Sequence, residues 1–347
     1  MKRVAINGFG RIGRTFFRQV FQSSDFDIVA INDLGNLDNL AYLLKYDSVY
    51  REFDKDVSSK EEDGQKYITI GNPSNSAGSF KKILFLNEKD PANLPWKDLK
   101  VDVVVESTGF FTTLEKAQPH IDAGAKRVVI TAPAKDDVTP TSTPNVGEEF
   151  LKNGQITSNA SCTTNAVTPV MAVMMINPGI EKALLNTVHG YTASQSLVDG
   201  PDRSGDFRRG RAAAVNMIPS STGAAIATTK AIPHMAGKFD GIAMRIPLAI
   251  GSLIDFTFVA SKKTSVEEIN NLFKEAAKSD NWKGILAVTE EPIVSSDIIG
   301  NPHGSIVDLS MTRVVDGDLV KILSWYDNEW GYCSMLLKHV QTLVKML

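Results

Sequence analysis

The chain has 347 residues, of which 43% are hydrophobic and 22% are charged, and its formal net charge is −3. This composition is typical of a globular protein with room for two domains. The small negative charge gives no support to a nucleic-acid-binding role, and no apolar stretch approaches membrane-spanning length. We therefore expect neither a nucleic acid nor a membrane as a partner.

The first 160 residues alternate short apolar runs with helical patterns. Strands are predicted at 4–7, 27–32, 101–106 and 127–131, and helices at 11–22, 37–45 and 113–123. Strands that alternate with helices predict an α/β fold with a parallel, doubly wound sheet of the Rossmann type. The more polar segment 46–96 is predicted to add antiparallel hairpins at the edge of that sheet.

The pattern changes after residue 162. Helices are predicted at 166–176 and 265–278, strands at 241–246, 253–260, 305–308, 312–315 and 319–325, and an amphipathic helix at 330–347. This part is predicted to be an α+β domain with a mostly antiparallel sheet. Between these elements lies a long irregular region, 190–218, and loops of this length are usually functional.

A glycine-rich turn follows the first predicted strand. Gly8, Gly10 and Gly13 form the pattern Gly-x-Gly-x-x-Gly before a helix, and Asp33 ends the next strand 20 residues after Gly13. This context favours a dinucleotide site over a turn without a ligand, because the glycines let the backbone approach a pyrophosphate at the helix N-terminus. Asp33 would accept hydrogen bonds from ribose hydroxyls and repel a 2′-phosphate. Because residues 34–36 supply no cation, the sequence predicts NAD and not NADP.

Cys162 lies in the segment Ser-Asn-Ala-Ser-Cys-Thr-Thr-Asn, among small polar residues instead of the apolar neighbours that a structural cysteine prefers. A position at the start of a helix favours a thiolate. His189 follows the strand-like stretch 184–188 and is the best candidate for a base, although a structural histidine is an equally good interpretation from the residues alone. Cys333 is the one other cysteine, and two cysteines favour a reducing, cytoplasmic setting over a disulfide scaffold. The isolated histidines predict no metal site.

Nearly the whole chain resembles the phosphorylating glyceraldehyde-3-phosphate dehydrogenases. The resemblance rests on residues 7–14, 31–34, 106–109, 131–133, 158–165, 189–192, 221–225, 245–247 and 325–332. Segments 158–165 and 325–332 are highly specific to the family. With these motifs the chain is expected to contain an NAD-binding domain at 1–161, a catalytic domain at 162–326, and a helix at 327–347 that packs back on the first domain. The resemblance also implies a homotetramer.

The resemblance implies a reaction for the thiol. Cys162 would attack the aldehyde carbon of glyceraldehyde 3-phosphate and form a hemithioacetal. His189 would lower the pKa of the thiol and take the hydroxyl proton as hydride leaves for the nicotinamide. Inorganic phosphate would then attack the thioester, which releases 1,3-bisphosphoglycerate and the free Cys162 thiol.

The resemblance also implies binding roles. The residues expected to bind the C3 phosphate of the substrate are Thr192 and Arg245, and those expected at the attacking phosphate are Ser161, Thr163, Thr222 and Gly223. The residues expected at the cofactor are Gly8, Gly10, Arg11, Ile12, Gly13, Asp33, Thr131, Asn328, which would hold the carboxamide, and Tyr332, near the ring. From the residues alone, an ion pair for Arg245 and a helix cap for 221–223 are the alternative interpretations.

Three positions depart from the usual family pattern. Ala166 stands where a second cysteine is common, Tyr50-Arg51 stands where His-Gly is usual, and the loop 202–211 differs from the commonest form. The rival functions are an erythrose-4-phosphate dehydrogenase, a semialdehyde dehydrogenase and a non-catalytic NAD-fold binding protein. Segment 221–225 argues against the first of these.

Overall fold

The computed structural model describes residues 1–71, 80–202 and 205–347. The chain forms two compact units: the first comprises Met1–Pro140, Glu149–Asn159 and Leu336–Leu347, and the second comprises Thr141–Glu148 and Ala160–Met335. The units depart from our predicted domain limits at 141–148, 160–161 and 327–335, and those limits remain a prediction.

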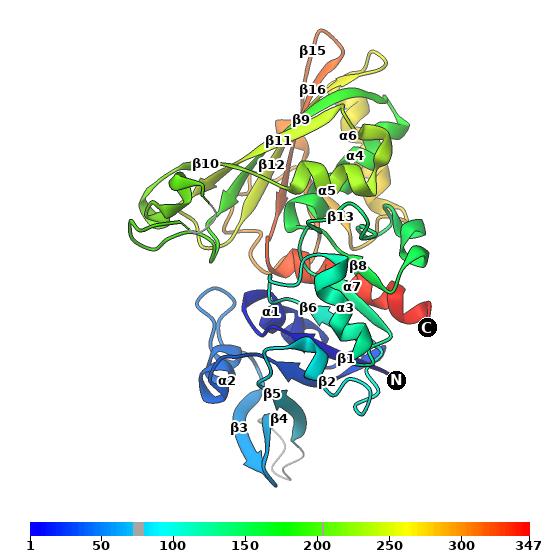
Figure 1. The fold of residues 1–347 in the computed structure, drawn as a ribbon. Helices are drawn as coiled ribbons and strands as arrows, with labels where there is room; N and C mark the ends of the chain where they lie inside the picture. Colours follow the sequence, from blue (N-terminus) through cyan, green and yellow to red (C-terminus); the bar gives the residue numbers. More distant parts are fainter. Residues whose placement is uncertain (72–79, 203–204) are drawn as a thin grey trace. The chain divides into compact units, whose positions relative to one another are not determined.

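The first unit is built on an eight-stranded sheet with the order β3-β4-β5-β2-β1-β6-β7-β8 (Figure 1). Its strands are β1 Lys2–Asn7, β2 Phe26–Asn32, β3 Asp56–Glu62, β4 Gln65–Gly71, β5 Lys81–Leu86, β6 Val103–Glu106, β7 Arg127–Ile130 and β8 Ile156–Ser158. The strands from β5 to β8 are parallel, whereas β3, β4 and β5 pair antiparallel at one edge. The predicted Rossmann-type sheet is confirmed, and β8, which is too short to give a sequence pattern, was not predicted. Part of the predicted hairpin region, 72–79, lies outside the described residues.

Helices cover this sheet. They are α1 Arg11–Val20, α2 Leu37–Lys45, α3 Leu114–Asp122 and the C-terminal part of α7 Trp330–Lys345, with short 3₁₀ turns at Pro91–Asn93 and Glu148–Asn153. The side chain of Asn36 caps α2 and that of Thr113 caps α3, each accepting a hydrogen bond from an N–H of the first turn. All four residues of β6 are buried, as expected for a central parallel strand.

The second unit contains a mixed sheet with the order β10-β11-β9-β12-β16-β14-β13, and β15 pairs with β16. Its strands are β9 Ile180–Gly190, β10 Ile218–Ser221, β11 Phe239–Ile246, β12 Ser252–Ala260, β13 Leu286–Thr289, β14 Ser305–Asp308, β15 Arg313–Val315 and β16 Leu319–Tyr326. Most pairs are antiparallel, as predicted. The pairs β11–β9 and β13–β14 are parallel.

Helices α4 Cys162–Ile176, α5 Ala224–Ala231 and α6 Val266–Lys278 pack on one face of this sheet (Figure 1). Short 3₁₀ turns lie at Phe207–Gly210, Ala213–Val215, Pro233–Met235 and Leu309–Met311. The prediction placed the start of α4 at residue 166, where the apolar run begins, and this start is wrong. The helix begins four residues earlier because Ser161 caps it.

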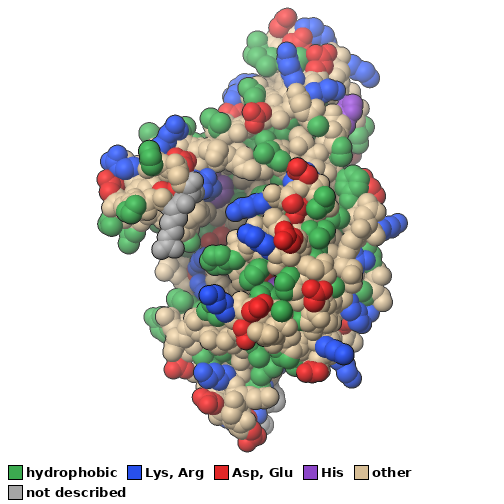
Figure 2. Space-filling model, viewed as in Figure 1, with side chains coloured by type: hydrophobic (Ala, Val, Ile, Leu, Met, Phe, Trp, Pro, Cys, Tyr) green, Lys and Arg blue, Asp and Glu red, His purple; other side chains and the backbone are tan. Residues whose placement is uncertain are grey.

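Charged side chains of both signs are interspersed on the face drawn in Figure 2. This distribution agrees with the small net charge of −3, and no large field of one sign dominates that face.

His339 of α7 is buried inside the first unit. Its Nε2 lies 3.0 Å from Thr157 Oγ1, and its Nδ1 lies 3.4 Å from Asn159 Nδ2. Since an amide nitrogen only donates, Nδ1 accepts and Nε2 carries the proton. Burial lowers the pKa of His339 from 6.5 to about 3, so the folded chain keeps this ring uncharged.

Acid should therefore destabilise the fold. As the pH falls from about 6.5 towards about 3, the unfolded chain binds a proton at His339 that the folded chain refuses, so the free energy of unfolding falls. This one group should account for a loss of about 2 kcal/mol between pH 7 and pH 5. Urea unfolding of His339→Gln should show a shallower pH dependence than that of His234→Gln, whose site is exposed. Equal slopes for the two variants would rule out this assignment.

Candidate active site

Cys162 is the first residue of α4, where backbone N–H groups have no partner within the helix. The Ser161 Oγ atom accepts a hydrogen bond from Thr164 N at 3.1 Å, and the Ser161 carbonyl accepts one from Asn165 N at 3.0 Å. Ala160 adopts a left-handed conformation with φ of 57°, which turns the chain from an extended segment into the helix. The thiol is therefore presented at a helix N-terminus, and Cys162 is partly exposed.

The structure brings Cys162, His189 and Arg245 into contact. Strand β9 carries His189 and the neighbouring strand β11 carries Arg245 opposite it in register. His189 Nε2 lies 3.4 Å from Cys162 Sγ. On the other side of the ring, Nδ1 lies 2.6 Å from the Gly190 carbonyl oxygen and 2.7 Å from Arg245 Nη1. The ring of His189 thus connects the thiol to the guanidinium.

Burial disfavours the charged form of each member of the thiol–imidazole pair. It lowers the pKa of His189 to about 3, and the charge of Arg245 acts in the same direction. Burial also raises the pKa of the Cys162 thiol, against the opposing charge of Arg245 and hydrogen bonds from Thr163. The expected lowering of the thiol pKa by His189 stays a prediction. The charge of Arg245 acts to lower the pKa of the thiol.

Tyr326 ties α4 to β9. Its hydroxyl lies 2.9 Å from Thr163 Oγ1 and 2.8 Å from Thr187 Oγ1, and its ring meets that of His189 edge to face at 5.9 Å. Burial raises the pKa of Tyr326, so the hydroxyl stays protonated. The sequence analysis did not single out Tyr326, whose hydroxyl fixes the helix against the strand.

The other predicted phosphate-binding hydroxyls lie in loops next to these strands. Thr192 follows β9, and its N–H donates to Gln195 Oε1 at 3.3 Å. Thr222 Oγ1 accepts a hydrogen bond from Ala224 N at 3.2 Å, just before α5, and Gly223 is the residue that precedes that helix. Segment 221–223 therefore does cap a helix, and that local role is compatible with binding an anion at the same N–H groups.

Arg209 is a residue of this region that the sequence interpretation did not single out. Its guanidinium donates to Ser220 Oγ at 2.8 Å and to the Ser221 carbonyl at 3.3 Å, directly before Thr222. Its charge also lowers the pKa of Arg245, which places the two guanidinium groups within electrostatic reach of each other. The arginine-rich composition of loop 202–211 was the available signal.

The glycine turn lines a cleft of about 960 Å³ in the first unit, together with Asp33. Gly8 has φ of +94°, which favours glycine, and a Cβ atom on Gly13 would lie 2.2 Å from the Gly8 carbonyl oxygen. A Cβ atom on Gly10 would meet no atom within 4 Å. Gly8 and Gly13 are therefore required by the fold, whereas the space beside Gly10 suits the close approach of a pyrophosphate.

Asp33 is held by two backbone groups. Its carboxylate accepts hydrogen bonds from Phe9 N at 2.6 Å and Gly35 N at 2.7 Å. The same cleft contains Leu34 and Phe110, whose side chains are 60% and 77% exposed. Two exposed apolar groups beside the carboxylate that is predicted to bind ribose suit a planar base. The sequence analysis did not find Phe110 because it lies 77 residues from Asp33.

The remaining predicted cofactor residues have local partners. Arg11 and Ile12 open α1, and the Arg11 guanidinium pairs with Asp47 and lies over the ring of Tyr50. Thr131 donates its hydroxyl to the Glu106 carbonyl.

Asn328 and Tyr332 belong to the second unit. Asn328 Oδ1 accepts hydrogen bonds from Gly251 N and Ser252 Oγ, both at 3.0 Å, and the hydroxyl of Tyr332 donates to the Ala160 carbonyl at 3.3 Å. Both side chains are buried, so each is fixed in place by its own unit.

Within residues 1–71, 80–202 and 205–347, no three His, Cys, Asp or Glu side chains are grouped so as to hold a metal ion. No helix in the same ranges combines the length and apolar character needed to span a bilayer. Cys162 and Cys333 are free thiols.

Comparison with known proteins gives a consistent result. Residues 2–114 match the family model described as the NAD binding domain of glyceraldehyde 3-phosphate dehydrogenase, and residues 161–328 match its C-terminal domain. Curated proteins named glyceraldehyde-3-phosphate dehydrogenase from Streptomyces coelicolor and Mycobacterium avium are each 47% identical, covering 96% and 99% of both chains. One from Clostridium acetobutylicum is 44% identical and covers 100% of this chain and 99% of its own. This chain belongs to the glyceraldehyde-3-phosphate dehydrogenase family.

Proposed function

We propose that this chain catalyses the NAD-dependent oxidation and phosphorylation of D-glyceraldehyde 3-phosphate to 1,3-bisphosphoglycerate, a step of glycolysis and gluconeogenesis. The observation that carries the proposal is the 3.4 Å contact between Cys162 Sγ and His189 Nε2 in a chain of this family. Erythrose-4-phosphate dehydrogenase and a non-catalytic binding role are not favoured by the names of the relatives.

The residues divide the chemistry between them. Cys162 Sγ attacks the aldehyde carbon, and the thiol proton passes through His189 Nε2 to the aldehyde oxygen, which becomes the hydroxyl of the hemithioacetal. His189 Nε2 then takes that hydroxyl proton as the hemithioacetal is oxidised to a thioester. NAD bound in the first unit supplies the hydride acceptor. Asn328, whose Oδ1 is held by two donors, orients the carboxamide of the cofactor, and Tyr332 packs near its ring.

Two anion sites serve the substrate and the attacking phosphate. Arg245 is partly buried, and among the described residues no carboxylate lies within ion-pair distance of it, so it is a cation that lacks a counter-ion. We assign the C3 phosphate of the substrate to Arg245 and Thr192. The attacking phosphate is assigned to Ser161, Thr163, Thr222, Gly223 and the additional residue Arg209.

The cofactor lies along the glycine turn. Gly8, Gly10 and Gly13 let the backbone approach the pyrophosphate at the start of α1, where Arg11 and Ile12 present their N–H groups. Asp33 accepts from the ribose hydroxyls, and Thr131 lies after β7 at the same carboxyl edge of the sheet. We also propose a cytoplasmic location, because the thiol of Cys162 must stay reduced.

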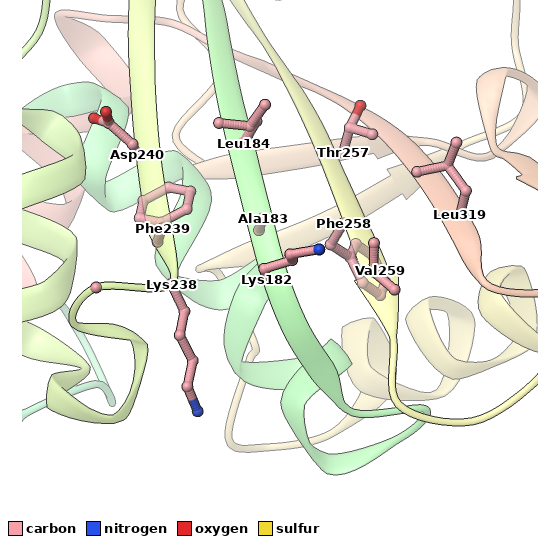
Figure 3. Close-up of a pocket in the computed structure, with 11 residues that line it drawn as sticks. Lys182, Ala183, Leu184, Lys238, Phe239, Asp240, Thr257, Phe258, Val259 and Leu319 are labelled. Atoms are coloured by element: carbon pink, nitrogen blue, oxygen red, sulfur yellow. The ribbon is translucent and has the colours of Figure 1, made fainter.

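We further propose that the chain assembles as a homotetramer. The face of the second sheet opposite the helices carries Leu184, Ile242 and Leu319, whose side chains are 66%, 53% and 44% exposed. A hollow of about 630 Å³ lies on these strands. Figure 3 shows Leu184, Thr257 and Leu319 among the residues that line it. Loop 190–218 adds exposed apolar side chains, including Phe207 at 88%. Exposed apolar patches of this kind mark interaction sites.

The proposed reaction predicts how turnover depends on phosphate and on Cys162. NAD reduction by the wild-type chain with glyceraldehyde 3-phosphate should require inorganic phosphate for sustained turnover, because phosphate and not water releases the thioester. Cys162→Ser should lower the rate by roughly a thousandfold or more while NAD binding stays measurable. Cys333→Ala is the matched control and should retain turnover, since that thiol is buried away from the reaction. Turnover that is indifferent to phosphate would refute the proposed function.

The second prediction separates the two roles of the glycines. Gly13→Ala should destabilise the fold by roughly 1–3 kcal/mol, because its Cβ atom would lie 2.2 Å from the Gly8 oxygen. Gly10→Ala should leave the melting temperature unchanged and weaken NAD binding by roughly tenfold, about 1.4 kcal/mol. Thermal unfolding and calorimetric titration with NAD check both variants. Unweakened NAD binding in Gly10→Ala would remove the pyrophosphate from this turn.

The third prediction concerns assembly. The wild type should sediment at four times its chain mass of 37.8 kDa. Leu184→Lys, in the middle of the exposed sheet face, should shift the protein to a smaller species because a buried unpaired charge is costly. Ile176→Lys is the matched control at another exposed apolar position, and it should leave the mass unchanged. A wild type that sediments as a single chain would contradict the homotetramer.

A further inference from the structure

A buried carboxylate ends strand β6, at the carboxyl edge of the sheet in the first unit. Glu106 is 2% exposed, and it pairs in register with Asn7, the last residue of the neighbouring strand β1. The glycine turn follows Asn7, and Thr108 lies two residues after Glu106. Because Asn7 and Thr108 both line the cleft of the glycine turn, Glu106 adjoins the wall of the site proposed for the cofactor.

The carboxylate of Glu106 is surrounded by hydrogen-bond donors. Its Oε1 accepts from the N–H of Thr108 at 2.8 Å and from the Thr108 hydroxyl. Its Oε2 accepts from Asn7 Nδ2 at 2.5 Å, and His120 Nε2 lies 3.1 Å from the same oxygen. Both oxygens of the buried side chain are therefore held by groups that belong to the first unit.

The buried ring of His120 supplies a fourth donor and no charge. Its Nδ1 lies 3.0 Å from Trp96 Nε1, and because an indole nitrogen only donates, Nδ1 must accept. The one proton of the neutral ring is then on Nε2, which donates to Glu106. A second proton on the ring would face the indole N–H. With four donors and no acceptor around it, Glu106 has no partner for a proton of its own and is ionised.

The charge of Glu106 has no counter-ion. Among the residues that the structure describes, His120 is the one basic side chain within ion-pair distance of this carboxylate, and its ring is neutral. A charge in a buried, low-dielectric position acts more strongly on other charges than one in water. The carboxyl edge of the sheet thus carries an uncompensated negative charge at the end of β6, between β1 and β7.

The place of this charge in the sheet determines which part of a dinucleotide it meets. The chain adds β2 on one side of β1 and β6 on the other, and dinucleotides bind across such a topological switch point. The glycine turn after β1 suits the pyrophosphate, and Asp33 after β2 suits the adenosine ribose. We therefore expect the nicotinamide half on the other side, over the ends of β6 and β7, where Glu106 lies.

We propose that the charge of Glu106 biases the cofactor site towards NAD and against NADH. The nicotinamide ring of NAD carries a positive charge, which the ring of NADH has lost. Both forms carry the same pyrophosphate, so its repulsion by Glu106 cancels in the ratio of their dissociation constants. The carboxylate therefore favours binding of NAD before hydride transfer and release of NADH after it. This inference rests on the cofactor site of the proposed function.

Calorimetric titration of the full chain with NAD and with NADH tests the charge. Glu106→Gln should lower the ratio of the NADH dissociation constant to the NAD dissociation constant by roughly threefold or more, because only NAD loses an attraction. Asp102→Asn is the matched control and should leave the ratio unchanged. Asp102 precedes β6 at its other end, and Lys126 Nζ lies 2.7 Å from its carboxylate. An unchanged ratio in Glu106→Gln, or an equal fall in Asp102→Asn, would overturn the proposal.

A second pair of variants keeps the test valid if Glu106→Gln alone disturbs the fold. The amide nitrogen introduced by that substitution would face the N–H of His120, and Trp96 prevents the ring from moving its proton. Trp96→Phe removes the indole donor, so in Glu106→Gln/Trp96→Phe the ring can carry its proton on Nδ1 and accept at Nε2. The double variant should show the same fall in the ratio. Trp96→Phe alone, which keeps the carboxylate, should not, and an equal fall there would assign the effect to packing and refute the role of the charge.

The wild type separates this inference from the proposed function. If it binds neither NAD nor NADH, the proposed function fails and the inference fails with it. If it binds both, and their ratio does not respond to the loss of the carboxylate, the inference alone fails.

Discussion

The ring of His189 contacts Cys162 Sγ through Nε2, and the Gly190 carbonyl and Arg245 through Nδ1. The chemistry of the site depends on which ring nitrogen carries a proton. The fall in the pKa of His189 from 6.5 to about 3 corresponds to roughly 5 kcal/mol against forming the imidazolium. Burial and the charge of Arg245 both act against protonation of this ring, and burial is the larger of the two causes.

The scaffold holds this arrangement through register and a few hydrogen bonds. Parallel pairing of β9 and β11 sets His189 opposite Arg245, so their separation is fixed by backbone hydrogen bonds. The hydroxyl of Tyr326 then binds the start of α4 to β9. Movement of the helix by one residue would break that bridge and take Cys162 Sγ away from the ring. The Cys162 thiol is thus placed by the same contacts that build the core of its unit.

Local patterns made part of this site predictable. The glycine turn, Asp33 and the polar surroundings of Cys162 each follow from a short stretch of sequence. The contact of Arg245 with His189 Nδ1 could not be predicted from a short stretch of sequence. It joins residues 56 apart through the parallel pairing of β9 and β11, which the alternation of apolar and polar residues does not reveal. The start of α4 was misplaced for a related reason. Apolar periodicity begins at residue 166, whereas the helix begins at the cap supplied by Ser161.

Ala166 bears on what happens when Cys162 is oxidised. Its side chain is fully buried in the core of the second unit, four residues along α4 from the thiol, and Cys333 is buried as well. Cys162 therefore has no cysteine beside it on α4 that could rescue an oxidised sulfur as a disulfide. Oxidation of cysteine follows its thiolate character, and burial raises the pKa of this thiol. Burial of Cys162 therefore lowers the fraction of thiolate that is open to oxidation.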